Sequence, residues 1–172
     1  LLNGVPSIVI GTFAYALLVL PMHHNSAIAG GAALAMMMIP ITLRSTEEFL
    51  RSVPDNLREG AMALGASKSK AIASIVVPAA MRGIIIALLL SVARVAGETA
   101  PLLFTSGNTQ FWSHGWLQTT ASLPVMIYTY AISPYPDWWR QAWAAGFLLL
   151  AAIFMINIIA RLVIWRGIGQ AK

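Results

Sequence analysis

The sequence has 172 residues, of which 58% are hydrophobic and only 10% are charged, and its formal net charge is +5. Ordinary soluble domains carry about 25% charged residues, and a soluble fold of this length has too little interior to hide so much apolar surface. The composition therefore predicts an integral membrane protein. The basic residues are sparse and lie between apolar stretches, which excludes nucleic-acid binding. Without cysteine, disulfides and thiolate chemistry are excluded too.

Four stretches are long and apolar enough to cross a bilayer, which takes roughly 17–25 helical residues. We expect these spans at Val5–Pro21, Ser26–Leu43, Pro78–Gly97 and Ala142–Ile164. Their glycines and prolines are typical of close helix packing and local kinks; they are Gly11, Gly30, Gly31, Pro40, Gly83 and Gly146. The predicted fold is an all-α polytopic bundle that forms one transmembrane domain over residues 1–172. The chain begins at Leu1, without methionine, so we expect natural sequence upstream.

Lysines and arginines between the spans predict their orientation. Nine of the eleven basic residues fall on one side if the four spans cross alternately; they are Arg44, Arg51, Arg58, Lys68, Lys70, Arg82, Arg161, Arg166 and Lys172. We expect this side, including the C-terminus, to face the cytoplasm. Arg82 and Arg161 are interpreted as anchors that reach the headgroups on that side.

The connection on the opposite, outer side has no charged residue from Thr99 to Pro136. Its apolar run Leu123–Ile132 is too short to cross, so we interpret it as a re-entrant or interfacial helix. The tryptophans near it suit a membrane interface, where indole rings anchor a protein in lipid; they are Trp112, Trp116, Trp138 and Trp139. The pair His23–His24 is interpreted as an outer turn, and we expect neither a metal site nor a cofactor.

The basic loop Arg44–Val77 contains signals for ordered structure. Ser45 predicts a helix N-cap, because Glu48 follows three residues later and completes a capping box. We therefore expect a helix to begin at Ser45, near the start of the loop.

Further along the same loop, the sequence predicts a helical hairpin. A short helix is expected over Leu57–Leu64, with Gly65 ending it. Ser67 is expected to cap a second helix that reaches Pro78. We therefore predict a helix-turn-helix on the cytoplasmic surface.

The stretch EGAMALGASKSKAIASIVVP, Glu59–Pro78, resembles the EAA loop of ABC importer permeases. That loop reads Glu-Ala-Ala, three residues, Gly, nine residues, Ile, one residue, Leu-Pro. Gly60 and Val77 depart from it, and both replacements are small or apolar. The resemblance implies that the loop docks into a groove of an ATP-hydrolysing subunit. The residues expected to carry this coupling are Arg58, Glu59, Gly60, Ala61, Leu64, Gly65 and Pro78.

The residue types of this loop suit a docking surface. Leu57, Ala61 and Leu64 form an apolar stripe at helical spacing, which we expect to face the partner. Arg58 and Glu59 would make charged contacts at its rim. The alternative is a helix that packs only on its own chain. The chain has no G-x-x-x-x-G-K-[ST] motif, so we expect it to be no enzyme and ATP hydrolysis to come from a partner.

The stretch RVAGETAPLLF, Arg94–Phe104, resembles the pore helix of permease subunits of phosphate ABC importers, and its ending resembles the PstA type. The stretch Asn25–Ser67 is similar to the same subunits, and the resemblance runs from about Pro6 to Arg166. That family has six spanning helices. The resemblance implies that the protein lies in a bacterial or archaeal inner membrane, in contact with membrane lipid. It also implies three protein partners: a homologous second permease (PstC type), a cytoplasmic ATPase dimer (PstB type) and an extracytoplasmic phosphate-binding protein (PstS type).

Arg94 and Glu98 stand four residues apart, so on one helix they would share a face. A guanidinium matches the oxygens of phosphate with two parallel hydrogen bonds. We expect Arg94 to contact phosphate and Glu98 to neutralise it between transport events. Thr99 offers a hydroxyl, and Gly97 leaves room for the anion or for a helix break. The alternative is an Arg–Glu pair that only locks two helices together.

The predicted function is alternating-access import of inorganic phosphate, driven by closure of the partner ATPase. One alternative is a permease of the same architecture for another oxyanion or solute. A passive anion channel or a membrane scaffold is a second alternative, against which the Glu59–Pro78 pattern argues. No catalytic constellation supports an intramembrane enzyme.

Overall fold

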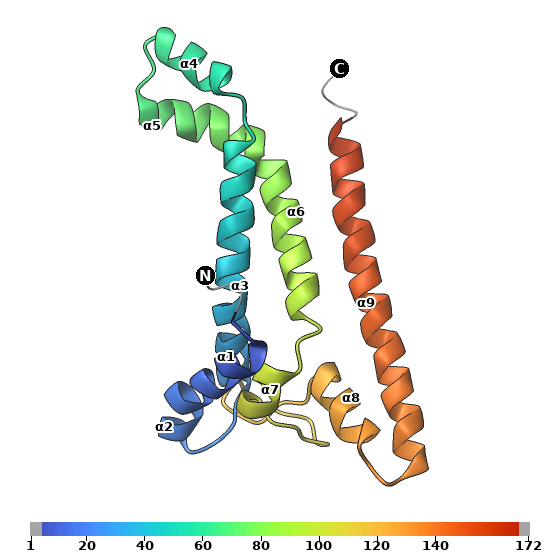
Figure 1. The fold of residues 1–172 in the computed structure, drawn as a ribbon. Helices are drawn as coiled ribbons and strands as arrows, with labels where there is room; N and C mark the ends of the chain where they lie inside the picture. Colours follow the sequence, from blue (N-terminus) through green and yellow to red (C-terminus); the bar gives the residue numbers. More distant parts are fainter. Residues whose placement is uncertain (1–4, 169–172) are drawn as a thin grey trace. The chain divides into compact units, whose positions relative to one another are not determined.

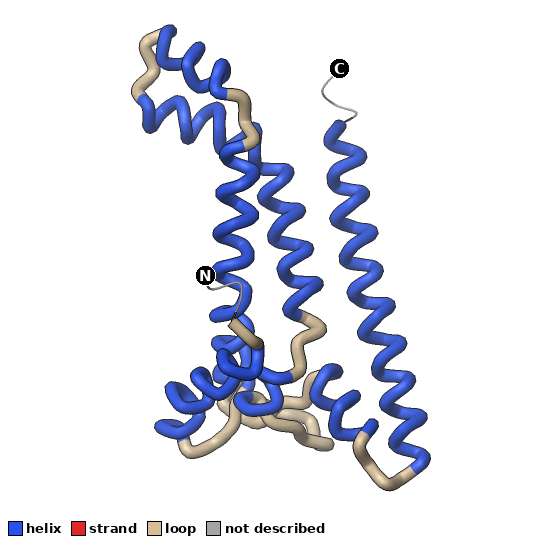
Figure 2. Tube along the Cα trace, viewed as in Figure 1, coloured by secondary structure: helices blue, strands red, loops and turns tan. Residues whose placement is uncertain are grey.

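The computed structural model describes residues 5–168, with side chains described for residues 5–162. Regular structure in this range is entirely helical (Figure 2). The elements, labelled in Figure 1, are α1 (Ser7–Ala14), the π-helix η2 (Tyr15–Val19), α2 (Leu20–Met22), α3 (Ala27–Arg51), α4 (Asp55–Ala63), α5 (Lys68–Ala71), the π-helix η3 (Ile72–Val76), α6 (Val77–Val95), α7 (Ala100–Thr105), α8 (Leu123–Ala131) and α9 (Pro136–Ile168). The all-α prediction is confirmed.

The chain forms two compact units. Among the described residues, the first contains residues 5–40 together with Val92–Met155, and the second contains Ile41–Ser91 together with residues 156–168. The long helices α3, α6 and α9 each contribute to both units. The outer connection lies in the first unit, and the predicted coupling loop lies in the second.

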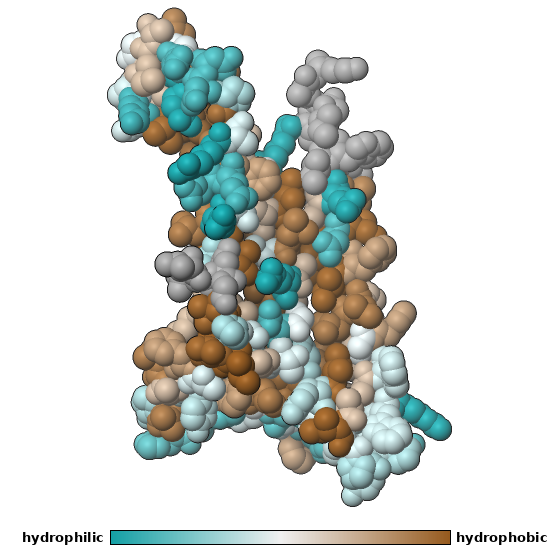
Figure 3. Space-filling view, in the orientation of Figure 1, coloured by the Kyte–Doolittle hydropathy of each residue, from teal (hydrophilic) through white to brown (hydrophobic). Residues whose placement is uncertain are grey.

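Three helices are long and apolar enough to cross a membrane: Ala27–Arg51, Lys68–Val95 and Pro136–Leu162. They confirm three of the four predicted spans, although each extends beyond the predicted bounds at one end. In the most apolar stretch of each helix, at most 22% is buried within the chain. Figure 3 shows apolar side chains over the exposed surface. Such a surface needs lipid or other helices to cover it.

The predicted span Val5–Pro21 is not confirmed, because the helix found there, Ser7–Met22, is below spanning length. Pro6 precedes its first turn, and His23 ends it in a left-handed conformation with φ 58°. At 1.5 Å per residue the helix is roughly 24 Å long, against about 30 Å of hydrocarbon.

The predicted capping box at Ser45 is wrong, because α3 runs through it to Arg51. Two ion pairs at i,i+4 spacing support the polar end of the helix: Arg44–Glu48 at 3.3 Å and Arg51–Glu47 at 2.7 Å. The glutamates that suggested a cap therefore pair along the helix.

The predicted helix boundary at Pro78 is also wrong, because one continuous helix runs through it from Lys68 to Val95. The helix accommodates the proline by forming the π-turn η3 just before it. There the N–H of Val77 donates to the carbonyl of Ile72, five residues earlier. A wider turn makes room for a pyrrolidine ring that would clash in a regular helix.

Close helix packing is confirmed at three of the predicted glycines. A Cβ on Gly11 would lie 2.9 Å from the Cα of Pro101, and one on Gly30 would lie 2.9 Å from the Cβ of Ser106. These contacts hold α7 against α1 and α3. A Cβ on Gly83 would overlap the ring of Phe49. Around Gly31 and Gly146, in contrast, no described atom lies within 4 Å of such a Cβ.

Candidate functional site

The predicted coupling loop is a helical hairpin of α4 and α5, here called the coupling hairpin after its predicted role. Figure 1 shows the two helices folded back on each other. Gly65 ends α4 with φ 88°, and its N–H donates to the carbonyl of Met62 at 2.9 Å. The N–H of Ala66 donates to the carbonyl of Ala61 at 3.1 Å, which completes a Schellman motif. The hydroxyl of Ser67 then accepts from the N–H of Lys70 at 3.4 Å. The predictions that Gly65 ends the first helix and that Ser67 caps the second are confirmed.

The two faces of α4 lie in different environments. Ala61 is only 8% exposed and faces the chain itself, where α4 contacts α5 and η3. Leu64 is 92% exposed, and Leu57 is 46% exposed. The predicted outward stripe is therefore wrong at Ala61, because the inner face of α4 packs against its own hairpin.

The outward face of α4 is small and open. Glu59, Gly60, Ala63 and Leu64 are exposed, and a Cβ on Gly60 would meet no described atom within 4 Å. Another backbone can therefore approach closely here. Arg58 is half-buried, and its guanidinium lies 3.3 Å from the carboxylate of Asp55, so it is held on the hairpin.

A small apolar core fixes this hairpin to the long helices. It consists of Val53, before α4, Val76, in η3, and Ala80, in α6, with Leu50 and Ile84 packed against it. The three central side chains are 2–7% exposed. The base of α4 and the π-turn therefore share one packed contact.

The four predicted substrate-pathway residues lie at the connection between α6 and α7. Arg94 is exposed in the last turn of α6, which ends at Val95. Gly97, Glu98 and Thr99 follow outside the helix, and the N–H of Glu98 donates to the carbonyl of Val95 at 3.1 Å. The predicted shared helix face is therefore wrong, because the helix ends before Glu98. Among the described residues, no ion pair joins Arg94 to Glu98.

The position of Arg94 lowers the cost of its charge. Free carbonyls at a helix C-terminus carry partial negative charge, which stabilises a cation by about 0.3–1 kcal/mol. A charge at the end of a helix also reaches the interface more readily than one at its centre. Glu98 and Thr99 are half-buried, so the connection presents a cation, a carboxylate and a hydroxyl within a few residues.

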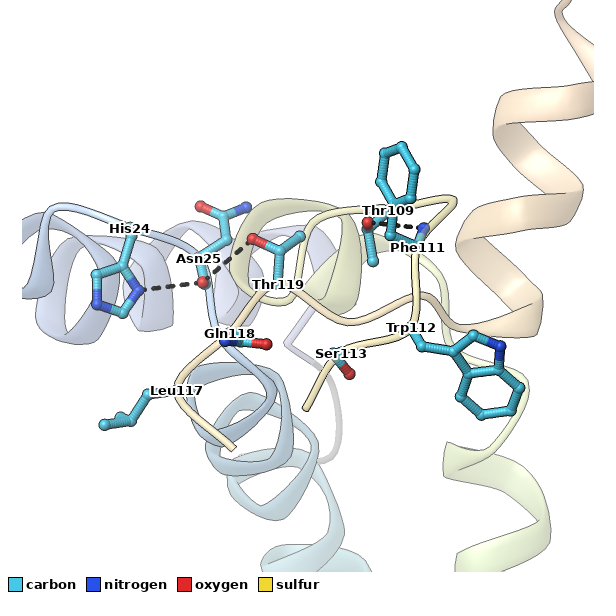
Figure 4. Close-up of a pocket in the computed structure, with 9 residues that line it drawn as sticks. All are labelled: His24, Asn25, Thr109, Phe111, Trp112, Ser113, Leu117, Gln118 and Thr119. Atoms are coloured by element: carbon cyan, nitrogen blue, oxygen red, sulfur yellow. Dashed lines mark hydrogen bonds between the residues drawn. The ribbon is translucent and has the colours of Figure 1, made fainter. Parts of the chain in front are cut away.

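An open basin of about 430 Å³, here called the loop basin, lies between the turn after α2 and the connection that follows α7 (Figure 4). Its lining residues are His24, Asn25, Thr109, Phe111, Trp112, Ser113, Leu117, Gln118 and Thr119. None of these described residues is lysine or arginine, so the basin offers no fixed positive charge to an anion. Its polar groups and exposed rings suit a macromolecular surface better.

The loop basin is held together by contacts between distant parts of the chain. The hydroxyl of Thr119 donates to the carbonyl of Asn25 at 3.4 Å, and Nδ1 of His24 lies 3.2 Å from the same oxygen. Phe111 and Trp112 are 83% and 91% exposed, and Figure 4 shows their rings projecting in different directions. Two large apolar side chains are thus free to meet a partner.

The same connection caps the start of α3. The N–H groups of Ala27 and Ile28 donate to the carbonyls of Gln118 and Trp116, each at 3.0 Å. The N–H of Ser26 donates to the carbonyl of Thr105, the last residue of α7, at 3.1 Å. Helix N-termini leave such donors unsatisfied, so this loop completes the helix. Sequence reasoning missed the loop basin because its contacts join residues up to 94 positions apart. The signal available was the absence of charge from Thr99 to Pro136.

Residues 1–166 match the family described as "Binding-protein-dependent transport system inner membrane component". The chain is also similar to curated proteins called "Phosphate transport system permease protein PstA". The protein from Yersinia pestis is 46% identical over 95% of this chain and 55% of its own length, and that from Haemophilus influenzae is 48% identical over 94% and 57%. "Phosphate transport system permease protein PstA 1" from Mycobacterium tuberculosis is 41% identical over 94% and 53%.

The chain spans about half the length of the curated relatives it matches. No solved structure matches it significantly. The resemblance to PstA-type subunits is confirmed by these similarities, and the family match covers nearly every residue. The chain belongs to the family of binding-protein-dependent transport system inner membrane components.

Proposed function

We propose that this chain is part of a permease subunit, of the PstA type, in an ATP-driven importer of inorganic phosphate. The observation that carries the proposal is its 41–48% identity, over more than nine-tenths of its length, to proteins named as PstA phosphate permeases. The remaining components would be a homologous second permease, a cytoplasmic ATPase dimer and an extracytoplasmic phosphate-binding protein.

The outward face of α4 is the proposed contact with the ATPase. Its small residues, Gly60 and Ala63, allow close approach, and Leu64 projects with 92% of its surface exposed. Glu59 adds a charge at the edge of this face. Because the inner face packs on the hairpin, a force applied at Leu64 would reach the long helices and not be lost in a mobile loop.

The α6–α7 connection is the proposed substrate pathway. Arg94 supplies the guanidinium that binds phosphate oxygens, Thr99 supplies a hydroxyl, and Gly97 keeps the connection open. Glu98 stands close enough along the chain to weaken the binding, which favours release. Nothing neutralises Arg94 by direct pairing among the described residues, which leaves its donors free for an anion.

The loop basin is the proposed contact with the binding protein. It combines exposed aromatic rings with neutral hydrogen-bonding groups, the composition typical of interfaces between proteins.

The basic ends of α3 and α5, including Arg44, Arg51, Lys68 and Lys70, support a cytoplasmic location for the coupling hairpin. Arg161 supports the same side for the end of α9, while the side chain of Arg166 and all of Lys172 lie outside the described residues.

Substrate competition tests the proposed activity. The full-length subunit is reconstituted with its permease, ATPase and binding-protein partners, and uptake of labelled phosphate is measured against excess sulfate, molybdate or unlabelled phosphate. We expect only unlabelled phosphate to compete. Equal competition by sulfate or molybdate would indicate a permease for another oxyanion, and uptake without ATP would indicate a passive channel.

A further inference from the structure

The continuous helix Lys68–Val95 departs from regular α-helical hydrogen bonding at η3. In η3 the N–H of Val77 donates to Ile72, five residues earlier, and not to the residue four positions earlier. Pro78 follows immediately and has no N–H, so the carbonyl of Ser74 lacks its α-helical donor. A segment with a π-turn and a missing donor has fewer regular hydrogen bonds than its neighbours. Such segments are where helices bend and often lie at functional sites.

The π-turn η3 is in contact with α4, the first helix of the coupling hairpin. Ala61, on the inner face of α4, is 8% exposed. Val76, inside the π-turn, is 2% exposed and packs with Val53, which immediately precedes α4, and with Ala80 beyond Pro78. One packed core therefore contains residues from before, within and after the π-turn, all in the second unit.

A second π-turn in the chain provides an internal comparison. In η2 the N–H of Leu20 donates to Tyr15, again five residues earlier, and Pro21 follows. The backbone solution to a proline is therefore the same at both places. The η2 turn belongs to the first unit and contacts α1, α2 and α7, whereas η3 contacts the coupling hairpin. A change in transport that is seen on altering η3 but not η2 would therefore be due to the contact of η3 with the coupling hairpin.

We propose that the Ile72–Pro78 segment is the joint through which α4 moves α6, rather than a passive kink. Movement of α4 reaches the π-turn through the contact of α4 with η3 and through Val53, which precedes α4 and packs with Val76. The altered π-turn changes the direction of α6 relative to α5. The proposal rests on the proposed coupling function of α4. In it Pro78 acts as a positioning residue, because it keeps the π-turn from becoming a regular helix.

The experiment uses the complete transporter in proteoliposomes, with Pro78→Ala in the full-length subunit and Pro21→Ala as the matched control. Alanine restores the missing N–H and allows a regular helix. We expect the phosphate transported per ATP hydrolysed to fall roughly fivefold or more in Pro78→Ala, the range of a coupling free energy, with assembly retained. We expect Pro21→Ala to keep the wild-type ratio. An unchanged ratio in an assembled Pro78→Ala transporter would overturn the proposal.

A second measurement needs no substitution at the joint. Amide hydrogen exchange of residues 72–77 is compared between the ATP-bound and nucleotide-free states of the unmodified transporter, with residues 15–20 as the reference. We expect exchange to change with nucleotide at 72–77 and not at 15–20; equal exchange in both states at 72–77 would contradict the joint. If the wild-type transporter shows no ATP-dependent phosphate uptake, the proposed function itself fails.

Discussion

The ring of Phe49, on α3, lies directly against Gly83, on α6, so that a Cβ on the glycine would overlap the ring carbons. The neighbouring residues Leu50 and Ile84 pack against the core beneath the coupling hairpin. The absence of a side chain at Gly83 thus sets how closely the two helices approach. In membranes, small residues are the usual means by which helices come into such contact.

Gly83→Ala is expected to destabilise this helix pair. Overpacking costs about 1–3 kcal/mol, against a gain of up to about 1 kcal/mol from replacing a helical glycine. We expect a lower midpoint of thermal unfolding in detergent, and Phe49→Leu in the same chain should restore it. Gly146→Ala is the control, because no described atom lies within 4 Å of the added methyl group. Equal midpoints for Gly83→Ala and Gly146→Ala would show that the contact does not limit packing.

Gly65→Ala is expected to loosen the coupling hairpin, because Gly65 has φ 88°. A left-handed conformation costs an L-residue about 1–2 kcal/mol, so amide exchange in α4 should accelerate about tenfold or more. Gly60→Ala, within α4, should slow that exchange, because its position is helical and unobstructed. If both variants exchange at the same rate, the Schellman motif is not what holds the turn.

Leu64→Ala tests the proposed contact with the ATPase. Leu64 is 92% exposed, so its truncation should leave the fold of the subunit intact. We expect ATPase association to weaken about tenfold, equivalent to ~1.4 kcal/mol. Met62→Ala, on the same helix and 40% exposed, is the matched control and should retain association. Unaltered ATPase binding by Leu64→Ala would place the contact elsewhere.

Arg94→Gln is expected to abolish phosphate uptake while assembly with the partner subunits persists, because the amide cannot replace a charged, forked donor. Arg94→Lys should retain part of the uptake, since charge remains without the bidentate geometry. Arg140→Gln removes an exposed arginine from the first turns of α9 and serves as the control. Normal uptake by Arg94→Gln would mean that Arg94 has only a structural role.

Trp112→Ala tests the loop basin as the contact with the binding protein. Trp112 is 91% exposed, and an aromatic side chain of this kind often dominates an interface. We expect the concentration of binding protein that gives half-maximal uptake to rise about tenfold. Trp143→Ala removes an 82% exposed tryptophan from α9 and should not change that concentration. Equal effects of both variants would indicate that the indole rings contact lipid instead.

Local signals in the sequence predicted much of the coupling hairpin. Gly65 and Ser67 act through atoms within a few residues, so their roles as helix end and cap could be predicted directly. The buried face of α4 could not be predicted, because it depends on how α4 packs on α5 and on η3, which follow it in the chain. Helical periodicity predicted one apolar stripe of Leu57, Ala61 and Leu64. In the folded hairpin Ala61 is buried, whereas Leu57 and Leu64 are exposed.

The errors at Pro78 and at the capping box have a common physical origin. Ser45 and Pro78 are ordinary boundary signals, but long apolar helices continued through them by forming ion pairs or a π-turn. In lipid the cost of leaving backbone groups unpaired is high, which favours adjusting a helix over ending it. For Glu98 the opposite occurred, since α6 ends just before it.

The most direct test is the initial rate of labelled phosphate uptake into proteoliposomes that contain the complete transporter, measured with and without ATP on the cytoplasmic side. The reference is an otherwise identical preparation without the subunit that carries this chain. We expect uptake only when both ATP and this subunit are present. Phosphate uptake that is independent of either one would contradict the account.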